Sequence, residues 1–269
     1  MLDITVIQPR YFSGEKPDVK IAEFILSEIE KVPEGGLVLA PEYSNAGGLS
    51  DAQSELNALP RAEAMLKKAG ETAKAKCAYV AINVLEKRND EIKNSTYLFD
   101  KTGEAVFVYD KQHLPLSEVK LGVKAGSGAE KCRCVCEVDG IKFAFMTCYD
   151  VYFNEQIEYI AKHKPDVILV PGYQRGERTD IIEAQAKLTA FRCNSYVVRA
   201  SYSMDSDDHG GCSMIVAPDG QVLKNLGKEV GSISACVDPV EKYMRPAGFG
   251  EKLVRNDDFI SDGLCPEAF

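Results

Sequence analysis

Two periodicities of apolar and polar residues follow one another along the chain. Short apolar runs bounded by turn residues predict strands, since a buried strand needs only about four to eight residues. These runs are residues 4–8, 37–40, 78–84, 95–99, 105–109, 167–170, 196–200, 214–217, 221–223 and 232–237. Apolar residues three or four positions apart predict helices around Ile21, Ala62, Ile157 and Ile181. This alternation predicts an α/β fold with two sheets, each covered by helices on its outer face.

One further predicted strand ends in a cysteine. The apolar run 141–147 follows an Asp139-Gly140 turn and leads into Cys148, and a helix is expected from Asn154. A thiol at such a turn is lifted clear of the sheet and faces backbone N–H groups, as a nucleophile requires. The alternative is a buried cysteine that acts as a small hydrophobic residue. Taken alone, Cys148 favours the buried cysteine, since most intracellular cysteines are structural.

Two other predicted strands have charged residues at their exits. Glu42 follows the run 37–40 and Pro41, and Lys111 follows the run 105–109. Strand ends are where open α/β folds collect their binding sites. Alternatively, Glu42 caps the next helix and Lys111 is a solvated side chain. Taken with Cys148, however, they supply the base, positive charge and nucleophile that attack on an amide or nitrile carbon needs.

The segments around these three residues resemble the motifs of the nitrilase superfamily of carbon–nitrogen hydrolases, in the family's order Glu, Lys, Cys. The matching segments are Leu39-Ala40-Pro41-Glu42, residues 109–114 (YDKQHL) and residues 147–150 (TCYD). Further matches lie at residues 166–171, 190–194 and 211–220, so the resemblance spans about residues 3–238. It implies a four-layer α-β-β-α sandwich that forms a homodimer through helices near the cysteine.

The resemblance also implies a mechanism. Glu42 would accept the proton of Cys148, and Lys111 with the backbone N–H of Tyr149 would stabilise the oxyanion on the way to a thioester. A second family glutamate matches Glu118, which lies 118 − 111 = 7 residues past Lys111. Its family role is to position the lysine or the substrate and to assist proton transfer. The alternative for Glu118 is a carboxylate in a surface loop.

The chain departs from the family pattern where the substrate would lie. Many relatives have arginine after the cysteine where this chain has Tyr152, which weakens a reading as an N-carbamoyl amino acid hydrolase. Tyr173 stands where tryptophan is common. Arg175 or Arg178 would bind a substrate carboxylate with two hydrogen bonds, unless both are solvated loop charges.

We therefore expect a hydrolase that cleaves a non-peptide carbon–nitrogen bond, an amidase that acts on a small amide and releases ammonia. An N-carbamoyl-amine hydrolase and a nitrilase remain alternatives within the family. A Cys-dependent acyltransferase and a non-catalytic binding protein on the same fold are alternatives of another class. The sequence does not identify the substrate.

Length and composition narrow the domain organisation, the possible partners and the expected location. The 269 residues contain no linker-like segment, so we expect one domain over 1–269, with a core of 3–238 and a C-terminal tail of 239–269. The net charge of 32 − 41 = −9 argues against nucleic acid or an anionic membrane as partner. No apolar run approaches the roughly 18 residues that span a bilayer. Nine cysteines without a secretion signal indicate a reducing cytoplasm.

Three of those cysteines alternate along a predicted strand. Cys132, Cys134 and Cys136 would all lie on one face, because successive strand residues point to opposite faces. Neighbouring thiols on that face are about 6–7 Å apart, which is too far for shared metal coordination without distortion. Zinc sites also favour paired cysteines in loops. We therefore expect these cysteines to pack in the core, and we expect neither a metal nor an organic cofactor.

Overall fold

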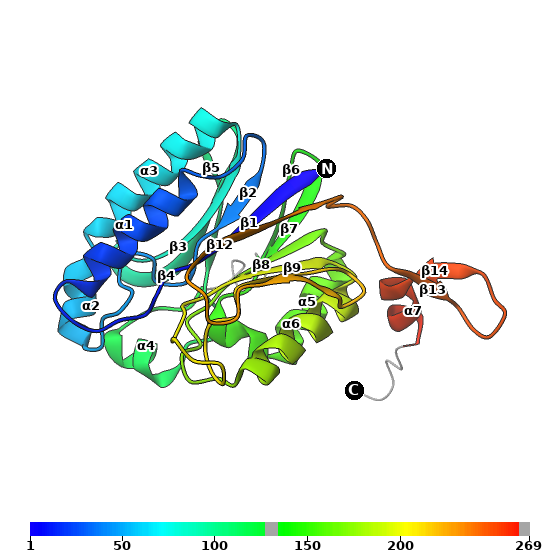
Figure 1. Ribbon diagram of the computed structural model, residues 1–269. Helices are drawn as coiled ribbons and strands as arrows, with labels where there is room; N and C mark the ends of the chain where they lie inside the picture. Colours follow the sequence, from blue (N-terminus) through cyan, green and yellow to red (C-terminus); the bar gives the residue numbers. More distant parts are fainter. Residues whose placement is uncertain (127–133, 264–269) are drawn as a thin grey trace.

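The computed structural model describes residues 1–126 and 134–263. Two six-stranded sheets pack face to face, with helices α1 and α3 outside one sheet and α5 and α6 outside the other (Figure 1). This is the predicted four-layer α-β-β-α sandwich. None of the described helices has both the length and the apolar character needed to cross a bilayer.

The first sheet has the strand order β12-β1-β2-β3-β4-β5. Its central strands β1, β2 and β3 run parallel, and the remaining pairs are antiparallel. The strands are β1 (Leu2–Gln8), β2 (Leu37–Leu39), β3 (Tyr79–Arg88), β4 (Glu91–Phe99), β5 (Ala105–Asp110) and β12 (Gly231–Val237). Helices α1 (Pro17–Ile29) and α3 (Arg61–Lys76) cover it.

The second sheet has the order β11-β10-β9-β8-β7-β6, with β7, β8 and β9 parallel. Its strands are β6 (Val135–Val138), β7 (Ile141–Phe145), β8 (Val167–Pro171), β9 (Tyr196–Ala200), β10 (Met214–Val216) and β11 (Val222–Asn225). Helices α5 (Asn154–His163) and α6 (Thr179–Cys193) cover its outer face. The exits of β2, β5, β7 and β8 carry the candidate site residues.

The core has two main layers because the sheets are buried on both faces. Along β3, Tyr79 and Ala81 belong to the cluster between the sheets, while Val80 and Ile82 belong to the cluster under α1 and α3. This is the period of two expected of a strand. Gly70, which should weaken α3, is explained by packing: a Cβ there would lie 2.9 Å from the carbonyl oxygen of Gly103.

The structure corrects three details of the prediction. The strand before Cys148 ends at Phe145, and the 3₁₀ helix η2 (Cys148–Tyr152) begins at the cysteine itself. The short helices α2 (Ala52–Ala58) and α4 (Leu116–Leu121) were not predicted, because each is too short for a clear period. Cys134 precedes β6 rather than lying within it; it is buried, Cys136 packs beside the same core, and Cys132 lies outside the described residues.

The described part of the tail forms a small unit beside the sandwich. Strands β13 (Met244–Pro246) and β14 (Leu253–Arg255) make a hairpin, followed by helix α7 (Asn256–Asp262), and the unit projects from the body (Figure 1). Asn194, at the end of α6, anchors it through hydrogen bonds with the Tyr243 backbone and the Asp257 carboxylate.

Candidate active site

Cys148 occupies a strained turn between β7 and η2. Its φ of 47° lies in the left-handed region, which a residue with a side chain adopts only where the surroundings enforce it. Thr147 and Asp150 enforce it with a capping box, in which the Thr147 N–H donates to Asp150 Oδ2 at 2.8 Å. The Cys148 residue is partly exposed, whereas Cys193 is fully buried. This geometry favours an elbow over a core cysteine.

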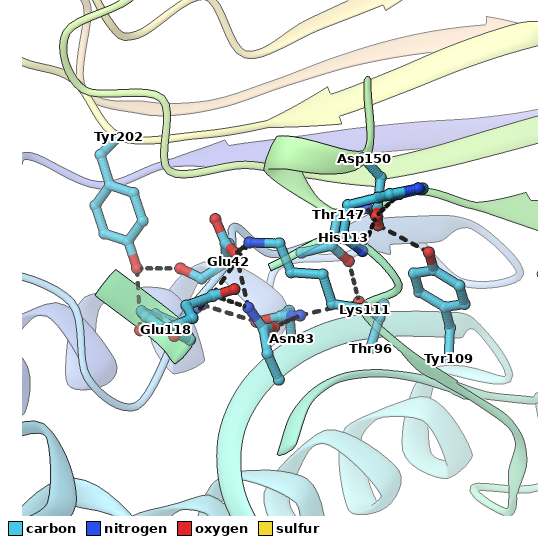
Figure 2. Close-up of polar contacts among 12 residues, drawn as sticks. Glu42, Asn83, Thr96, Tyr109, Lys111, His113, Glu118, Thr147, Asp150 and Tyr202 are labelled. Carbon is cyan, nitrogen blue, oxygen red and sulfur yellow. Dashed lines mark hydrogen bonds and ion pairs between the residues drawn. The ribbon is translucent and has the colours of Figure 1, made fainter. Parts of the chain in front are cut away.

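Glu42, Lys111 and Glu118 converge on one buried ion cluster (Figure 2). Lys111 Nζ lies 2.7 Å from Glu42 Oε1 and 3.1 Å from Glu118 Oε1. No side chain of the three is more than 5% exposed. The alternatives of a helix cap, a solvated lysine and a surface carboxylate therefore fail. Asp51, not Glu42, caps α2.

A polar shell that the sequence did not reveal holds the two carboxylates. Asn94 Nδ2 donates to Glu42 Oε1 at 2.8 Å and to Glu118 Oε1 at 2.7 Å, and Asn83 orients Asn94 with a 2.7 Å hydrogen bond. The Tyr43 hydroxyl donates to Glu118 Oε1 at 2.8 Å. The available signal was two asparagines within strands, where that residue is disfavoured.

The electrostatics of the cluster follow from burial and charge. Burial raises the pKa of the Cys148 thiol, as does its hydrogen bond with Glu42, while Lys111 and the Tyr173 backbone N–H lower it. Burial alone would lower the pKa of Lys111, but the charges of Glu42, Cys148 and Glu118 raise it above its usual value. Lys111 is therefore a permanent cation here. Burial also raises the pKa of Glu118, against the opposing charge of Lys111.

Asp150 connects the cysteine elbow to the lysine loop. Besides the Thr147 N–H, its carboxylate accepts from the Tyr109 hydroxyl at 2.7 Å and from the His113 backbone N–H at 2.9 Å. His113 Nδ1 also lies 2.9 Å from Asp150 Oδ1 (Figure 2). The His113 ring stacks on Phe153, with ring centroids 3.7 Å apart. One buried carboxylate thus fixes the loop after Lys111 against the turn before Cys148.

The predicted substrate residues lie around this centre. The backbone N–H of Tyr173 faces the Cys148 thiol. The Arg175 guanidinium lies over two aromatic rings, 4.7 Å from the Tyr173 centroid and 5.1 Å from that of Tyr11, and Nη1 donates to the Tyr11 hydroxyl at 2.8 Å. Its neighbour Arg178 instead pairs with Asp180.

Tyr149 follows the nucleophile at the start of η2. The first intrahelical hydrogen bond comes from the Asp150 N–H, which donates to the Thr147 carbonyl at 3.0 Å. The N–H of Tyr149 precedes that bond, and such N–H groups at the start of a helix lack intrahelical partners. Within residues 1–126 and 134–263 we find no cluster of three or more His, Cys, Asp or Glu residues that could hold a metal ion.

Comparison with known proteins identifies the family of the chain and the proteins that share its fold. The sequence profile of the Carbon-nitrogen hydrolase family matches residues 4–241, nearly the whole chain. The chain belongs to the carbon–nitrogen hydrolase family. Its fold is that of nitrilase-superfamily amidases: an amidase from Nesterenkonia sp. superposes with a TM-score of 0.73 at 21% identity, over 87% of this chain and 89% of that one.

Curated members of the family give the sequence context. A 2-oxoglutaramate amidase from Bacillus subtilis (strain 168) is 28% identical over 232 residues, which cover 82% of this chain and 84% of that protein. A deaminated glutathione amidase from Dictyostelium discoideum is 27% identical over 164 residues, or 56% of this chain and 55% of that protein. Both names describe hydrolysis of an amide.

Proposed function

We propose that this carbon–nitrogen hydrolase is an amidase that acts on a small amide through a thioester on Cys148. The observation that carries the proposal is the convergence of buried Glu42, Lys111 and Glu118 near Cys148, a partly exposed residue at a strained turn. A base, a fixed cation and a nucleophile are the groups that acyl transfer requires.

In the proposed reaction, Glu42 accepts the thiol proton as Cys148 Sγ attacks the amide carbon. Lys111 and the Tyr149 N–H stabilise the resulting oxyanion. The C–N bond then breaks, Glu42 returns the proton to the departing ammonia, and a thioester remains. Water attacks the thioester, Glu42 takes one of its protons, and the acid product leaves as the thiol is restored.

Glu118 is proposed to orient both Lys111 and the substrate. Its Oε1 accepts from Tyr43, Asn94 and Lys111, whereas its buried Oε2 has no hydrogen-bond partner among the described residues. A buried carboxylate oxygen is costly to leave unpaired. We infer that the amide N–H of the substrate donates to Oε2 and that Glu118 assists proton transfer.

Tyr173 and Arg175 are proposed to contact the rest of the substrate. The Tyr173 ring packs near Tyr43 and Tyr202, with centroids 6.0 and 4.7 Å away, and so gives the site an aromatic wall. None of the ion pairs among the described residues includes Arg175, in contrast to Arg178. Arg175 is therefore suited to bind a substrate carboxylate.

We infer that residues 1–269 form one catalytic domain that works as a homodimer in the cytoplasm, with a small amide as its partner molecule. The described cysteines form no disulfide with one another, in keeping with a reducing compartment. The exposed apolar residues of the tail support self-association; among the described residues they are Val240, Tyr243, Met244, Phe249, Leu253 and Phe259. Light scattering on the purified protein will test the dimer.

The test of the reaction is ammonia release from a panel of aliphatic amides, ω-amides of dicarboxylates, N-carbamoyl amines and nitriles. Cys148→Ala should release none, while Cys236→Ala, which alters an exposed cysteine, should match the native protein. Equal activity in Cys148→Ala would disprove the proposed nucleophile. Silence of the native protein across the panel would instead favour an acyltransferase or a binding protein.

A further inference from the structure

Arg199, on β9, is a buried cation whose partners are all neutral. The residue is only 3% exposed. Nη1 donates to the carbonyl oxygens of Gly211 and Cys212 at 2.6 and 2.8 Å, and Nη2 donates to Gln174 Oε1 at 3.0 Å. Among the described residues, the arginines that do form ion pairs are Arg10, Arg61, Arg88, Arg178, Arg192 and Arg255.

A charge in this position calls for a reason. Arginine keeps its proton at any pH that a folded protein meets. Burying a cation without a carboxylate is costly, and neutral acceptors return only part of the lost hydration. The charge itself therefore points to a nearby negative charge that forms during function.

A chain of hydrogen bonds links Arg199 through Gln174 to the cysteine elbow. Gln174, which Arg199 orients, follows Tyr173, whose N–H faces the thiol. Gln174 Nε2 also lies 3.2 Å from the hydroxyl of Tyr152, the last residue of the 3₁₀ helix that Cys148 begins. A small internal cavity is lined by Arg199, Gln174 and Met146, two residues before the cysteine. Burial lowers the pKa of the Arg199 guanidinium, and negative charge on Cys212, Cys148 or Tyr152 opposes that shift.

The charges of the site make Arg199 a suitable counter-ion. Glu42 and Glu118 carry two negative charges, and Lys111 carries one positive charge beside them. When the Cys148 proton moves to Glu42, one negative charge moves from the carboxylate to Sγ, beside the Tyr173 backbone N–H. With Arg199 counted, the two negative charges meet two positive ones.

We propose that Arg199 is a positioning residue whose buried charge stabilises the Cys148 thiolate and whose hydrogen bond to Gln174 holds the turn that carries the Tyr173 N–H. This rests on Cys148 as the proposed nucleophile, but it requires no knowledge of the substrate. Arg199 does not touch the reacting atoms; it acts through the field at Sγ and through Gln174.

The test follows the rate at which iodoacetamide alkylates Cys148 between pH 6 and 10, because only the thiolate reacts. Peptide mass spectrometry separates Cys148 from exposed Cys236, which serves as an internal reference. In Arg199→Met the rate at Cys148 should fall about tenfold at each pH in this range, because a rise of about one unit in the thiol pKa lowers the thiolate population tenfold. In Arg199→Lys the alkylation rate at Cys148 should stay within about threefold of the native rate, because the lysine keeps the positive charge.

A second pair of variants separates charge from structure. Gln174→Met breaks the hydrogen bond but keeps the charge, so its alkylation rate should fall less than that of Arg199→Met. The ionisable groups facing Cys148, namely Glu42, Lys111, Glu118 and Tyr152, are unchanged in every variant. If Arg199→Met does not fold, Arg199→Gln removes the charge and keeps donors for the carbonyls.

The proposal is overturned if the neutral variants retain the native alkylation profile, or if Arg199→Lys shifts it as far as Arg199→Met does. Thermal unfolding of each variant shows whether only stability has changed. Because alkylation needs no substrate, this outcome is independent of the ammonia assay. A protein that hydrolyses no amide in the panel can still show, or fail to show, the Arg199 effect.

Discussion

Two buried carboxylate centres, Asp150 in η2 and Glu118 in α4, have different surroundings. Asp150 is fully buried, and both of its oxygens have partners: the Thr147 and His113 N–H groups, the Tyr109 hydroxyl and His113 Nδ1. In Glu118, by contrast, Oε1 accepts three hydrogen bonds, and Oε2 accepts none from the described residues.

The difference indicates a division of labour. A carboxylate whose oxygens are satisfied holds fixed geometry, since any change would leave buried donors unpaired. A carboxylate with one free oxygen and a pKa raised by burial is able to accept a substrate hydrogen bond or a proton. We therefore expect substitutions at Asp150 to damage structure and rate together, and substitutions at Glu118 to damage rate alone.

The largest effect is expected for Lys111→Met, which removes the only cation bridging Glu42 and Glu118 in the described structure. The value of kcat should fall by about 10²–10³ or more, because the lysine is proposed to stabilise the oxyanion. The free energy of unfolding should fall by about 3–5 kcal/mol, as two buried carboxylates lose their partner. Ammonia release and urea unfolding measure the two effects.

The matched control is Lys101→Met, which alters a lysine whose side chain is 42% exposed. It should leave both quantities near native, since exposed ion pairs contribute little. A double variant, Lys111→Met with Glu118→Gln, should recover part of the lost stability but none of the rate. A native kcat in Lys111→Met would remove the lysine from the mechanism.

Asp150→Asn is expected to have the next largest effect. In this variant an amide NH₂ replaces one acceptor oxygen and faces N–H or O–H donors that it cannot accept from. This should lower the free energy of unfolding by about 1–3 kcal/mol. Because Asp150 joins the loop of Lys111 to the turn of Cys148, kcat should also fall by about 10² through misplacement. Asp139→Asn is the control, since that half-exposed carboxylate accepts from Tyr79 far from the thiol. If Asp150→Asn is less stable but keeps the native kcat, Asp150 does not position Lys111 against Cys148 for catalysis.

Glu118→Gln should separate the two centres. The amide oxygen can keep the donors from Tyr43, Asn94 and Lys111, and the new NH₂ replaces the unpaired Oε2, so stability should not fall. The value of kcat should drop by about 10²-fold if Glu118 assists proton transfer. A loss of stability as large as that of Asp150→Asn, with normal kcat, would reverse our assignment.

The pH dependence of Glu118→Gln has a definite sign. The folded state raises the pKa of Glu118 above its ordinary value of 4.5, so the folded protein binds that proton more tightly than the unfolded chain. Its favourable contribution is complete below 4.5 and is lost as pH rises through the folded pKa. Relative to the native protein, Glu118→Gln should therefore gain stability as pH rises from 4 to 7 in urea titrations.

The features that could be predicted from the sequence are those that depend on the local pattern of apolar and charged residues. Buried parallel strands such as β8 are short continuous apolar runs, and charged residues at strand exits such as Glu42 and Lys111 interrupt that pattern visibly. These features predicted the two covered sheets and brought attention to the residues that converge in the structure. Boundaries were less predictable, as β7 shows by ending two residues early, because the capping box decides where the strand stops.

The rest depends on which distant residues meet. Asn94 reaches Glu42 and Glu118 only because of the β3–β4 register, in which Leu85 faces Asn94. Asp150 stands beside Cys148 in the sequence, yet its role follows from contacts 37 and 41 residues away. Arg199 looks like one charge in an apolar strand, and only its buried surroundings show that no carboxylate meets it.

The smallest expected effect tests how the Asp150 centre keeps its geometry. Burial alone would lower the pKa of His113, but Asp150 and Glu155 raise it above its ordinary value of 6.5. The stabilisation is then complete below 6.5 and is lost as pH rises through the folded pKa. The advantage of the native protein over His113→Gln in urea unfolding should therefore be larger at pH 6 than at pH 9. Glu155→Gln, which alters an exposed partner 3.6 Å from Nε2, should reduce that pH dependence only slightly. An advantage equal at both pH values would mean that the stacked ring and its hydrogen bond, rather than its charge, hold Asp150 in place.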